Sequence, residues 1–367
     1  MTARPRVLMH LPFHPVAGNW VRAAEQHAEV VAVRLRRGGW PTVRVGDDGV
    51  HEVSVPRPRP GRLFWGVGQR IEARGIVQLL DRLEAEGTPI TVLHAHFAAS
   101  SRGMALAARR RGLPLIVTEH STWFTGENPD QPPITPDRLR RMLLPYHQAS
   151  AVMPVSESLR QAMIAAGVGH DLEVCPNPVD VTRFTADPGR AANRLITVSR
   201  LAPVKRIDVL VDAVAELRSR GVDVELEIVG DGPSAQGLRQ QIIDLRLDDV
   251  VTMTGRLESG DVARRLAAAG LFVTCSIVEN HPVAVIEAMS SGLSIIGPAI
   301  PSLVEMVPQP ECGTLLDGEL TPVRLADAIS AHLPGGTNER SRSRIVEHAS
   351  IDAVGRRLAD TYAAALA

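Results

Sequence analysis

The sequence predicts an α/β protein built from two doubly wound domains. Short apolar runs alternate with amphipathic stretches in both halves of the 367-residue chain. One of these stretches places Ile207, Leu210 and Val214 on a single helical face. Such alternation is typical of parallel sheets that are covered by helices on both faces. A chain of this length is expected to form about two domains, each with its own core.

The apolar runs predict where the strands of the two sheets lie. In the first half they are 6–9, 30–35, 91–94, 115–118 and 151–155, and in the second half 195–198, 224–229, 250–252, 271–275 and 294–296. Residues 185–190 lack an apolar pattern, so we place an N-terminal domain at 1–187 and a C-terminal domain at 188–350. The last amphipathic stretch, 351–367, predicts a helix that could pack on either domain, and we place it back on the N-terminal domain.

Three stretches are predicted to be turns or loops. Residues 57–62 are irregular, and residues 128–136 are polar and rich in proline, so we expect the latter as a loop over a cleft. Gly66 and Gly68 are similar to part of a dinucleotide-binding loop. Because the third glycine and the preceding strand are absent, we predict a simple turn there.

Composition and charge exclude several classes of protein. A formal net charge of −1 leaves no electrostatic footprint for nucleic acid. No apolar run approaches membrane-spanning length, and the N-terminal one is too short for a signal peptide, so we expect a cytoplasmic protein without stable membrane insertion. The arginine clusters leave open a weak contact with anionic membranes. The three cysteines show no metal-binding spacing, and we expect neither a metal nor a cofactor.

A single lysine, Lys205, stands among 40 Lys and Arg residues. Arginine presents a planar fork, whereas lysine is a compact point charge on a flexible stem. A position that keeps lysine in such a chain indicates a need for that point charge, and phosphate oxygens are a common reason. Chance survival of a surface lysine is the alternative. Arg200 precedes it at the end of a predicted strand, where doubly wound sheets bind ligands, so the two cations suit one diphosphate.

Two glutamates flank the start of a predicted helix. Pro282 indicates that start, so Glu279 lies before the helix and Glu287 lies along it. Each carboxylate can bind hydroxyl groups of a ligand, and the helix N-terminus between them suits an anion. Glu287 could instead be a solvated helix residue, but its apolar neighbours favour a partnered carboxylate. Gly230, at another strand end, would let a ligand ring approach the backbone.

The segments that contain Arg200 and Lys205, Gly230, and the two glutamates resemble, in their order and spacing, those of glycosyltransferase family 4. Members of this family are retaining enzymes of the GT-B architecture that use nucleotide sugars. The resemblance runs from Gly18 to the last helix and is strongest over 196–292. The family signature is a glutamate, seven residues, a second glutamate and then Ala-Met, which matches Glu279 to Met289. The resemblance implies two Rossmann-like domains that face a cleft, with the donor on the C-terminal domain and the acceptor on the N-terminal domain.

The resemblance also implies three sets of site residues. The expected catalytic residues are His120, Arg200, Lys205 and Glu279. The expected donor contacts are Gly18, Arg200, Lys205, Gly230, Arg256, Glu279, Asn280, His281, Pro282, Val283 and Glu287. The expected acceptor contacts are His10, His14, His96, Glu119 and His120. Among them, Arg200 and Lys205 would hold the diphosphate and Glu287 the ribose.

The sequence departs from the family pattern near the expected donor sugar. His281 and Pro282 stand where the family usually has Phe-Gly, and proline removes a backbone N–H. Ser199 replaces the usual glycine before Arg200. The identity of the donor sugar is therefore the least transferable inference. Ser156 and Asn177 match family landmarks that we interpret as structural, a helix cap and a turn.

We therefore predict a retaining glycosyltransferase that uses a nucleotide-sugar donor, a UDP-sugar. It would move the sugar to a hydroxyl group of a small sugar or aminocyclitol, as in antibiotic biosynthesis. Glu119, Glu127, Asp130 and Asp137 would suit an amino group on that acceptor, unless they form a solvated loop. Cell-envelope glycan or lipid-linked acceptors are an alternative. So are a nucleotide-sugar epimerase or phosphorylase and a non-catalytic nucleotide-sugar-binding protein. His94 and His96 could form a metal pair, but we favour a role in lining a pocket.

Overall fold

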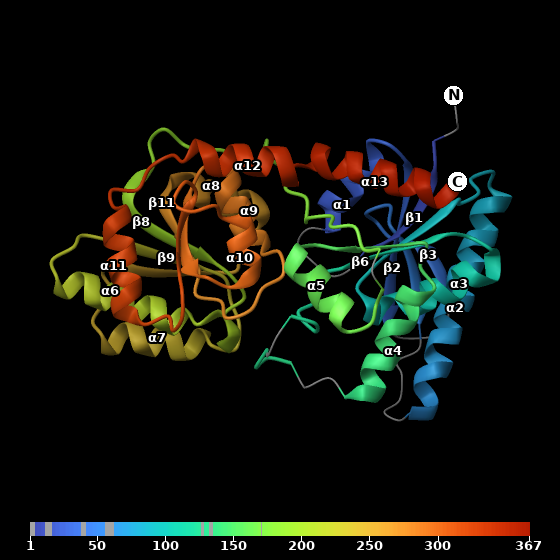
Figure 1. The fold of residues 1–367 in the computed structure, drawn as a ribbon, viewed down its shortest axis with the longest axis horizontal. Helices are drawn as coiled ribbons and strands as arrows, with labels where there is room; N and C mark the ends of the chain where they lie inside the picture. Colours follow the sequence, from blue (N-terminus) through green and yellow to red (C-terminus); the bar gives the residue numbers. More distant parts are fainter. Residues whose placement is uncertain are drawn as a thin grey trace. The chain divides into compact units, whose positions relative to one another are not determined.

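The computed structural model describes residues 4–11, 17–37, 42–55, 62–125, 128–131, 135–169 and 171–367. The chain divides into two compact units, each an α/β layered structure (Figure 1). The first unit consists of Met1–Phe124, Ile134–Pro178 and Ile351–Ala367, and the second of Thr125–Pro133 and Val179–Ser350. The predicted boundary between residues 187 and 188 lies within the second unit.

Within the described residues, the first unit contains a seven-stranded sheet in the order β3-β4-β2-β1-β5-β6-β7. Its strands are β1 (Arg6–His10), β2 (Glu29–Arg37), β3 (Val43–Val45), β4 (His51–Val55), β5 (Val92–His96), β6 (Leu115–Glu119) and β7 (Ala151–Pro154). Only β3 runs antiparallel, against β4, while the other pairs are parallel. The five strands predicted in this half are confirmed, whereas β3 and β4 were not predicted.

One helix of this unit differs from the prediction made from the sequence. The helices are α1 (Ala17–Glu25), α2 (Arg62–Ala85), α3 (Ala98–Arg111), α4 (Pro136–His147), α5 (Glu157–Ala165) and α13 (Ile351–Leu366). Gly66 and Gly68 belong to α2, so the predicted turn is wrong. A glycine costs about 1 kcal/mol in a helix, which a long packed helix tolerates. Ser156 does cap α5, because its side chain accepts a hydrogen bond from the Leu159 N–H.

The second unit contains, among the described residues, a six-stranded parallel sheet in the order β10-β9-β8-β11-β12-β13. Its strands are β8 (Ala191–Val198), β9 (Glu225–Val229), β10 (Val251–Gly255), β11 (Ala269–Val273), β12 (Ser294–Pro298) and β13 (Gly313–Leu316). All the strands predicted for this half are confirmed, and β13 is an addition. In such a sheet the carboxyl ends of β8, β9 and β10 lie along one edge, where ligands bind in open α/β folds.

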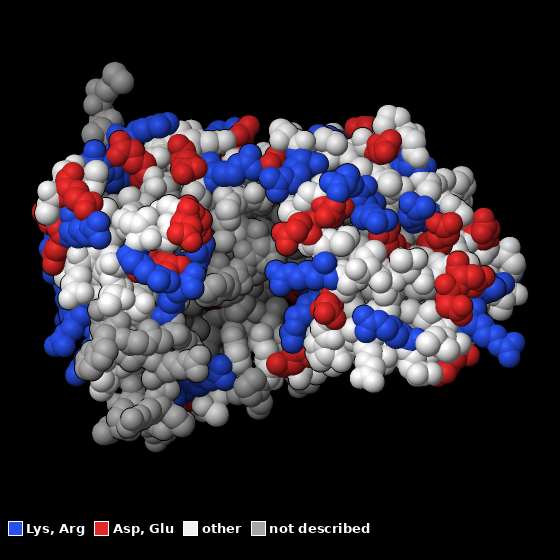
Figure 2. All heavy atoms as spheres, turned by 180° about the vertical axis from the view of Figure 1, so that it is seen from behind, with Lys and Arg blue, Asp and Glu red and all other residues white. Residues whose placement is uncertain are grey.

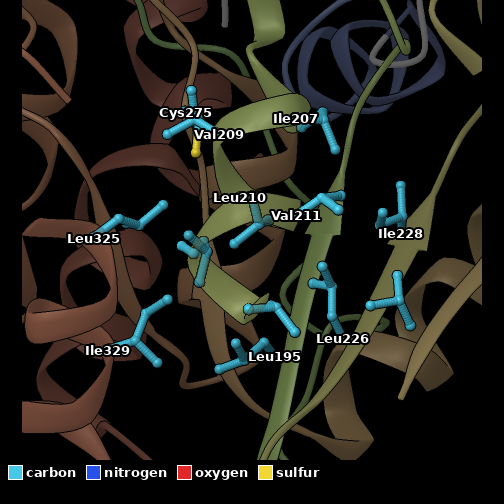
Figure 3. Close-up of a cluster of buried hydrophobic side chains, with 14 of the residues drawn as sticks. Leu195, Ile207, Val209, Leu210, Val211, Leu226, Ile228, Cys275, Leu325 and Ile329 are labelled. Carbon is cyan, nitrogen blue, oxygen red and sulfur yellow. The ribbon is translucent and has the colours of Figure 1, made fainter. Parts of the chain in front are cut away.

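Helices cover both faces of this sheet (Figure 1). They are a single 3₁₀ turn, η1 (Pro203–Lys205), and α6 (Ile207–Ser219), α7 (Ala235–Asp244), α8 (Ser259–Ala268), α9 (Val283–Ser290), α10 (Pro301–Met306), α11 (Pro322–His332) and α12 (Glu339–Ala349). Figure 3 shows α6 residues such as Leu210 packed between strand residues such as Leu226 and α11 residues such as Leu325. These side chains are fully or almost fully buried, and each contributes about 1.5–3 kcal/mol through the hydrophobic effect.

Acidic and basic side chains are interspersed on the face of the molecule drawn in Figure 2. Ion pairs within the second unit include those of Arg220 with Glu216 and with Asp327. Across the described parts of the chain, no helix combines the length and the apolar character that crossing a bilayer requires.

Candidate active site

The three predicted blocks at the ends of β8, β9 and β10 are joined by backbone hydrogen bonds. The Ser199 N–H donates to the Val229 carbonyl at 3.0 Å, and the Gly230 N–H donates to the Gly255 carbonyl at 2.9 Å. The Leu201 N–H donates to the carbonyl of the residue after Gly230, also at 2.9 Å. Loops that are far apart in sequence therefore form one continuous surface at the carboxyl edge of the sheet.

Gly230 is required by close backbone packing. Its φ is +138°, and a Cβ there would lie 1.8 Å from the Ser199 carbonyl oxygen. Gly232 has a similar constraint, because its Cβ would lie 2.4 Å from the Leu201 carbonyl oxygen. From the sequence, Gly230 was predicted to let a ligand ring approach the backbone. The structure gives a different physical reason, the approach of the neighbouring loop.

Substituting Gly230 with alanine is expected to destabilise the second unit by about 1–3 kcal/mol, because the loop that carries Arg200 must move or remain strained. Thermal unfolding should show a melting temperature lowered by several degrees. Gly237→Ala is the control, since Gly237 lies in α7 with no atom within 4 Å of an added Cβ, so alanine there should be neutral or stabilising. A Gly230→Ala protein as stable as the control would contradict this explanation.

Lys205 and Glu279 form an ion pair at the same edge. Lys205 ends η1, and Glu279 lies in the loop between β11 and α9. The Lys205 Nζ contacts Glu279 Oε1, and their side chains are 20% and 16% exposed. The Ile277 N–H donates to the Val204 carbonyl at 3.1 Å and holds the two loops together. The predicted cation and the first predicted acid are therefore adjacent, with the positive charge of one balanced by the other.

Arg200 is more open, with a side chain that is 67% exposed. Its Nη1 lies 3.6 Å from Asp130 Oδ2, on a segment that belongs to the second unit. In the same segment, the Thr125 hydroxyl donates to Asn280 Oδ1 at 2.5 Å, and Asn280 is buried. The segment thus contacts two residues predicted to bind the donor, Arg200 and Asn280.

The helix α9 begins where the sequence analysis placed it. Pro282 occupies the residue before the helix, and Val283 is its first residue. His281 precedes them, and burial lowers the pKa of its ring to about 4, so the ring is neutral at physiological pH. Arg256 lies in the exposed turn after β10. All these residues belong to the second unit.

Glu287 lies along α9 in an environment that disfavours its charge. Burial raises the pKa of its carboxyl group from 4.5 to about 8, and the Arg183 guanidinium offsets that shift only in part. Glu287 is therefore largely protonated near pH 7 in the unliganded protein. The carboxyl group that was expected to have a partner is therefore half-buried, and Arg183 is the cation that acts on it. Strongly shifted carboxyl groups of this kind are frequent at functional sites.

In the first unit, His120 follows β6 and is held at both ring nitrogens. Its Nδ1 lies 2.9 Å from Asn177 Oδ1, and its Nε2 lies 2.9 Å from His96 Nδ1. The Phe97 ring lies 4.7 Å from the His120 ring, centroid to centroid, and the Trp20 ring lies 5.7 Å from it. A buried aromatic cluster therefore surrounds the histidine that the resemblance identified.

Glu119 is turned into the interior. Its Oε1 accepts hydrogen bonds from the N–H groups of His120 and Ser121 at 2.9 and 2.7 Å, and its Oε2 accepts one from the Tyr146 hydroxyl. A fully buried carboxylate with three hydrogen bonds fixes the loop that carries His120. The Glu119 side chain, which was predicted to contact an acceptor, is thus buried and bonded to the protein's own groups.

The other acids of the predicted acceptor loop are also dispersed. Asp130 pairs with Arg200 in the second unit, and Asp137 pairs with Arg141 on α4. Glu127 lies outside the described residues. The expected acidic patch is thus not formed by the residues that the structure describes.

The remaining predicted residues of the first unit lie near the start of the chain. His10 ends β1, and burial lowers the pKa of its ring to about 4. Gly18 is the second residue of α1, exposed, with no atom within 4 Å of an added Cβ. His14 lies outside the described residues.

His94 is a buried structural histidine. Its ring nitrogens lie 2.8 Å from the Tyr362 hydroxyl and 2.8 Å from the Thr118 hydroxyl, so both are occupied. Burial lowers the pKa of this ring to about 3. In the part of the chain that the structure describes, no cluster of three or more His, Cys, Asp or Glu residues is arranged to hold a metal ion.

A mostly parallel sheet with a histidine network and a parallel sheet with charged groups at its strand ends, both covered by helices, define a two-domain protein of the Rossmann-like class. Two family models match consecutive parts of the chain. The model described as "Glycosyltransferase Family 4" matches residues 18–183, and the one described as "Glycosyl transferases group 1" matches residues 183–350. The chain belongs to glycosyltransferase family 4 and is a glycosyltransferase of the GT-B type.

Curated relatives share part of the chain. The phosphatidylinositol N-acetylglucosaminyltransferase gpi3 subunit of Schizosaccharomyces pombe is 26% identical over 226 residues, which are 60% of this chain and 48% of that protein. The putative colanic acid biosynthesis glycosyltransferase WcaL of Salmonella typhimurium is 26% identical over 283 residues, which are 73% of this chain and 69% of that protein. The chain thus spans about half the length of the yeast relative and more of the bacterial one.

The solved structure of Anabaena Alr3699/HepE in complex with UDP and glucose has the same fold. Its TM-score is 0.77 at 18% identity, over 98% of this chain and 100% of that one. This likeness shows the fold of the chain.

Proposed function

We propose that this protein is a retaining glycosyltransferase that moves a sugar from a nucleotide-sugar donor, first of all a UDP-sugar, to a hydroxyl group of an acceptor. The observation that carries the proposal is the arrangement at the carboxyl edge of the second sheet. There Arg200, the Lys205–Glu279 ion pair and the start of α9 belong to adjacent loops, and Glu287 lies along the helix. Such an edge is where nucleotides bind in doubly wound sheets.

The charges fit the chemistry of a departing nucleoside diphosphate. Breaking the bond between sugar and phosphate leaves added negative charge on the phosphate, and Lys205 with Arg200 would stabilise it. Preorganised charge of this kind is usually the largest catalytic contribution. When Lys205 binds a phosphate group instead of Glu279, the Glu279 carboxylate becomes available to accept hydrogen bonds from sugar hydroxyls. We propose that these side chains serve without a metal ion.

Retention of configuration would follow from attack on the face from which the phosphate departs. The acceptor oxygen bonds to the anomeric carbon as the bond between that carbon and the phosphate oxygen breaks. The hydroxyl proton passes to the departing phosphate. His120 would face the donor sugar and the acceptor, as the resemblance implies.

A UDP-sugar is the first donor to test. The Anabaena protein with the same fold was solved with UDP, with UDP-glucose, and with UDP and glucose. Two features leave the sugar itself open to experiment. His281 is neutral, and Pro282 lacks the N–H that the more usual glycine would offer to the donor.

For the acceptor, we propose a hydroxyl of a cell-envelope glycan or a lipid-linked sugar ahead of a small aminocyclitol. Of the carboxylates expected to bind an amino group, the three that the structure describes are buried or paired: Glu119 is buried, Asp137 pairs with Arg141, and Asp130 pairs with Arg200. The relatives include a putative colanic acid biosynthesis glycosyltransferase and an alpha-monoglucosyldiacylglycerol synthase of Streptococcus pneumoniae. The aminocyclitol acceptor and a role in antibiotic biosynthesis stay predictions from the sequence.

A thermal-shift screen with UDP, GDP, ADP and their sugars tests the donor class. A nucleotide present at a hundred times its Kd should stabilise the folded protein by about 2.7 kcal/mol, which raises the melting temperature by several degrees. We expect UDP and UDP-sugars to do so, and Lys205→Ala to reduce the shift most for UDP, which carries the added negative charge of the departed phosphate. If no nucleotide stabilised the protein, the proposed donor class would be wrong. A transferase should move the sugar when an acceptor is present and should leave the donor intact when the acceptor is absent. This pair of results would distinguish a transferase from an epimerase.

A further inference from the structure

We propose that Asn177 and His96 are positioning residues that hold the ring of His120 in one tautomer and one orientation. From the sequence, Asn177 was predicted to lie in a turn, and His96 was predicted to line a pocket as an acceptor contact. The proposal deepens the proposed function, since it rests on His120 facing the substrates. Its main test, however, reads the protonation of the ring nitrogens and needs neither substrate nor activity.

The hydrogen bonds run in one line through the first unit. Asn177 Oδ1 lies 2.9 Å from His120 Nδ1, and His120 Nε2 lies 2.9 Å from His96 Nδ1. Asn177 is 3% exposed and His96 is fully buried. Hydrogen bonds in such a water-poor environment are stronger than in water, and breaking one leaves a buried polar group to be desolvated.

The chemistry of the amide oxygen sets the direction of the whole line. A carboxamide oxygen only accepts, so His120 must carry its proton on Nδ1. The Nε2 of a neutral His120 then has a lone pair and accepts from Nδ1–H of His96. His96 in turn keeps a lone pair on its own Nε2. One fixed oxygen, on Asn177, therefore determines the tautomers of two histidines.

Two histidines beside this line have neutral rings. His94 stacks on His96 with centroids 4.7 Å apart, and burial lowers the pKa of His94 to about 3. His10 on β1 is also neutral, with a pKa lowered to about 4. Among the described residues, titratable groups bonded next to this line include Glu119 on β6, its partner Tyr146 on α4, and Tyr362 on α13. Glu119 is bound to backbone N–H groups and to Tyr146, and Tyr362 is bound to His94.

This arrangement separates His120 from proton transfer. Both ring nitrogens have protein partners, so His120 cannot accept the acceptor proton unless its bond to His96 breaks. Its contribution is a neutral ring in a fixed place. A misplacement of about 1 Å at a reacting group can lower a rate on the order of a hundredfold, which is what Asn177 and His96 would prevent.

The experiment is long-range ¹H–¹⁵N correlation on the full chain with ¹⁵N-labelled histidine, without ligand. His120→Asn and His96→Asn identify the two sets of signals by their loss. In the wild-type protein we expect a protonated Nδ1 and an unprotonated Nε2 on both rings. In Asn177→Ala the His120 ring should exchange between tautomers. His147→Asn, on the exposed end of α4, should leave both sets unchanged.

Asn177→Asp gives the sharpest outcome. A carboxylate at this position favours the charged imidazolium, so His120 should be doubly protonated at pH 7. His120 Nε2 would then donate, and His96 would have to move its proton from Nδ1 to Nε2 in order to accept. A residue with only a packing role would not switch the tautomer of a histidine one ring further away.

The result that overturns the proposal is a wild-type His120 protonated on Nε2, or one exchanging between tautomers. A neutral His120 in Asn177→Asp would overturn it as well. Circular dichroism and thermal unfolding of each variant show whether it is folded, and if Asn177→Ala does not fold, the wild-type and Asn177→Asp spectra still decide. Once a donor is found, Asn177→Ala should lower kcat roughly tenfold to a hundredfold with little change in KM. Failure of the proposed function would show separately, as absence of transfer by the wild-type protein.

Discussion

Replacing Lys205 by alanine is expected to lower the rate of sugar transfer by about a hundredfold to a thousandfold, equivalent to about 3–4 kcal/mol. Lys205 is the only lysine of the chain, and its charge sits at the carboxyl edge of the second sheet. If it stabilises the departing diphosphate, its effect is largest when that charge has developed. The fall should therefore appear mainly in kcat. The measurement is steady-state transfer with the donor that the thermal-shift screen selects.

The ion pair with Glu279 makes the result interpretable. Truncating Lys205 leaves Glu279 without this partner, so some stability is lost with the activity. A double-mutant cycle with Glu279→Gln separates the two, because unfolding reports the pair and kcat reports the phosphate. Lys205→Arg keeps the charge but replaces a flexible point charge by a planar fork, so we expect it to recover activity only in part.

The matched control is Arg206→Ala, because Arg206 is the adjacent cation in the sequence. Its side chain is 45% exposed and pairs with Asp208, also exposed. Such pairs contribute about 0–1 kcal/mol, and this one should leave kcat within a factor of two or so. Equal losses for Lys205→Ala and Arg206→Ala would mean that the site needs only general positive charge. Full activity in Lys205→Ala would remove Lys205 from the mechanism.

The strands were predictable where burial on both faces produces a continuous apolar run. That holds for β1, β5 and β6 in the first sheet and for β8 and β11 in the second. The strand β3 has only three residues and alternates valine with arginine, and β4 carries histidine and glutamate. Glu52 on β4 is buried through ion pairs with Arg36 and Arg44. No pattern of apolar residues indicates a strand that is buried through charges.

The candidate site was predictable to the extent that its residues lie in short contiguous blocks. Lys205 and Glu279 follow strands that are neighbours in one parallel sheet, so topology alone brings them together. The histidine network is different, since His120 meets Asn177 across 57 positions and His94 meets Tyr362 across 268. Glu119 shows the same limit, because a sequence does not tell whether a polar side chain at a strand end points to solvent or to backbone N–H groups.

Stability should fall as pH rises through the range in which Glu287 loses its proton. The pKa of Glu287 is about 8 in the folded protein and 4.5 in the reference state, so the folded protein binds more protons between these values. Unfolding then becomes easier by up to about 1.4 kcal/mol per pH unit, on the order of 5 kcal/mol across the whole range. His10 and His281 have lowered pKa values, so they act in the opposite sense as pH falls from 6.5 to about 4.

Glu287→Gln isolates the effect, because glutamine keeps the shape and cannot ionise. The variant should match the wild type near pH 5 and be more stable by several degrees at pH 8, in thermal unfolding scans across that range. Glu311→Gln is the control at an exposed position and should follow the wild type at every pH. A wild-type curve parallel to that of Glu287→Gln would show that Glu287 is already ionised in the folded protein.

Glu287→Gln should also weaken nucleotide binding. The substitution would then raise the stability of the protein at pH 8 and lower its affinity for the nucleotide. If the Glu287 carboxylate accepts hydrogen bonds from ribose hydroxyls, glutamine loses a bond to a charged group, about 1.5–3 kcal/mol or roughly tenfold and more in Kd. Binding to the wild type at pH 7 should also release a proton, because the bound form is the ionised one. Titration calorimetry in buffers of different ionisation enthalpy measures that proton directly, and Glu287→Gln should release none. At pH 8 glutamate at position 287 makes the protein less stable than glutamine would. A role in stability alone would therefore favour glutamine, whereas a role in binding ribose favours glutamate.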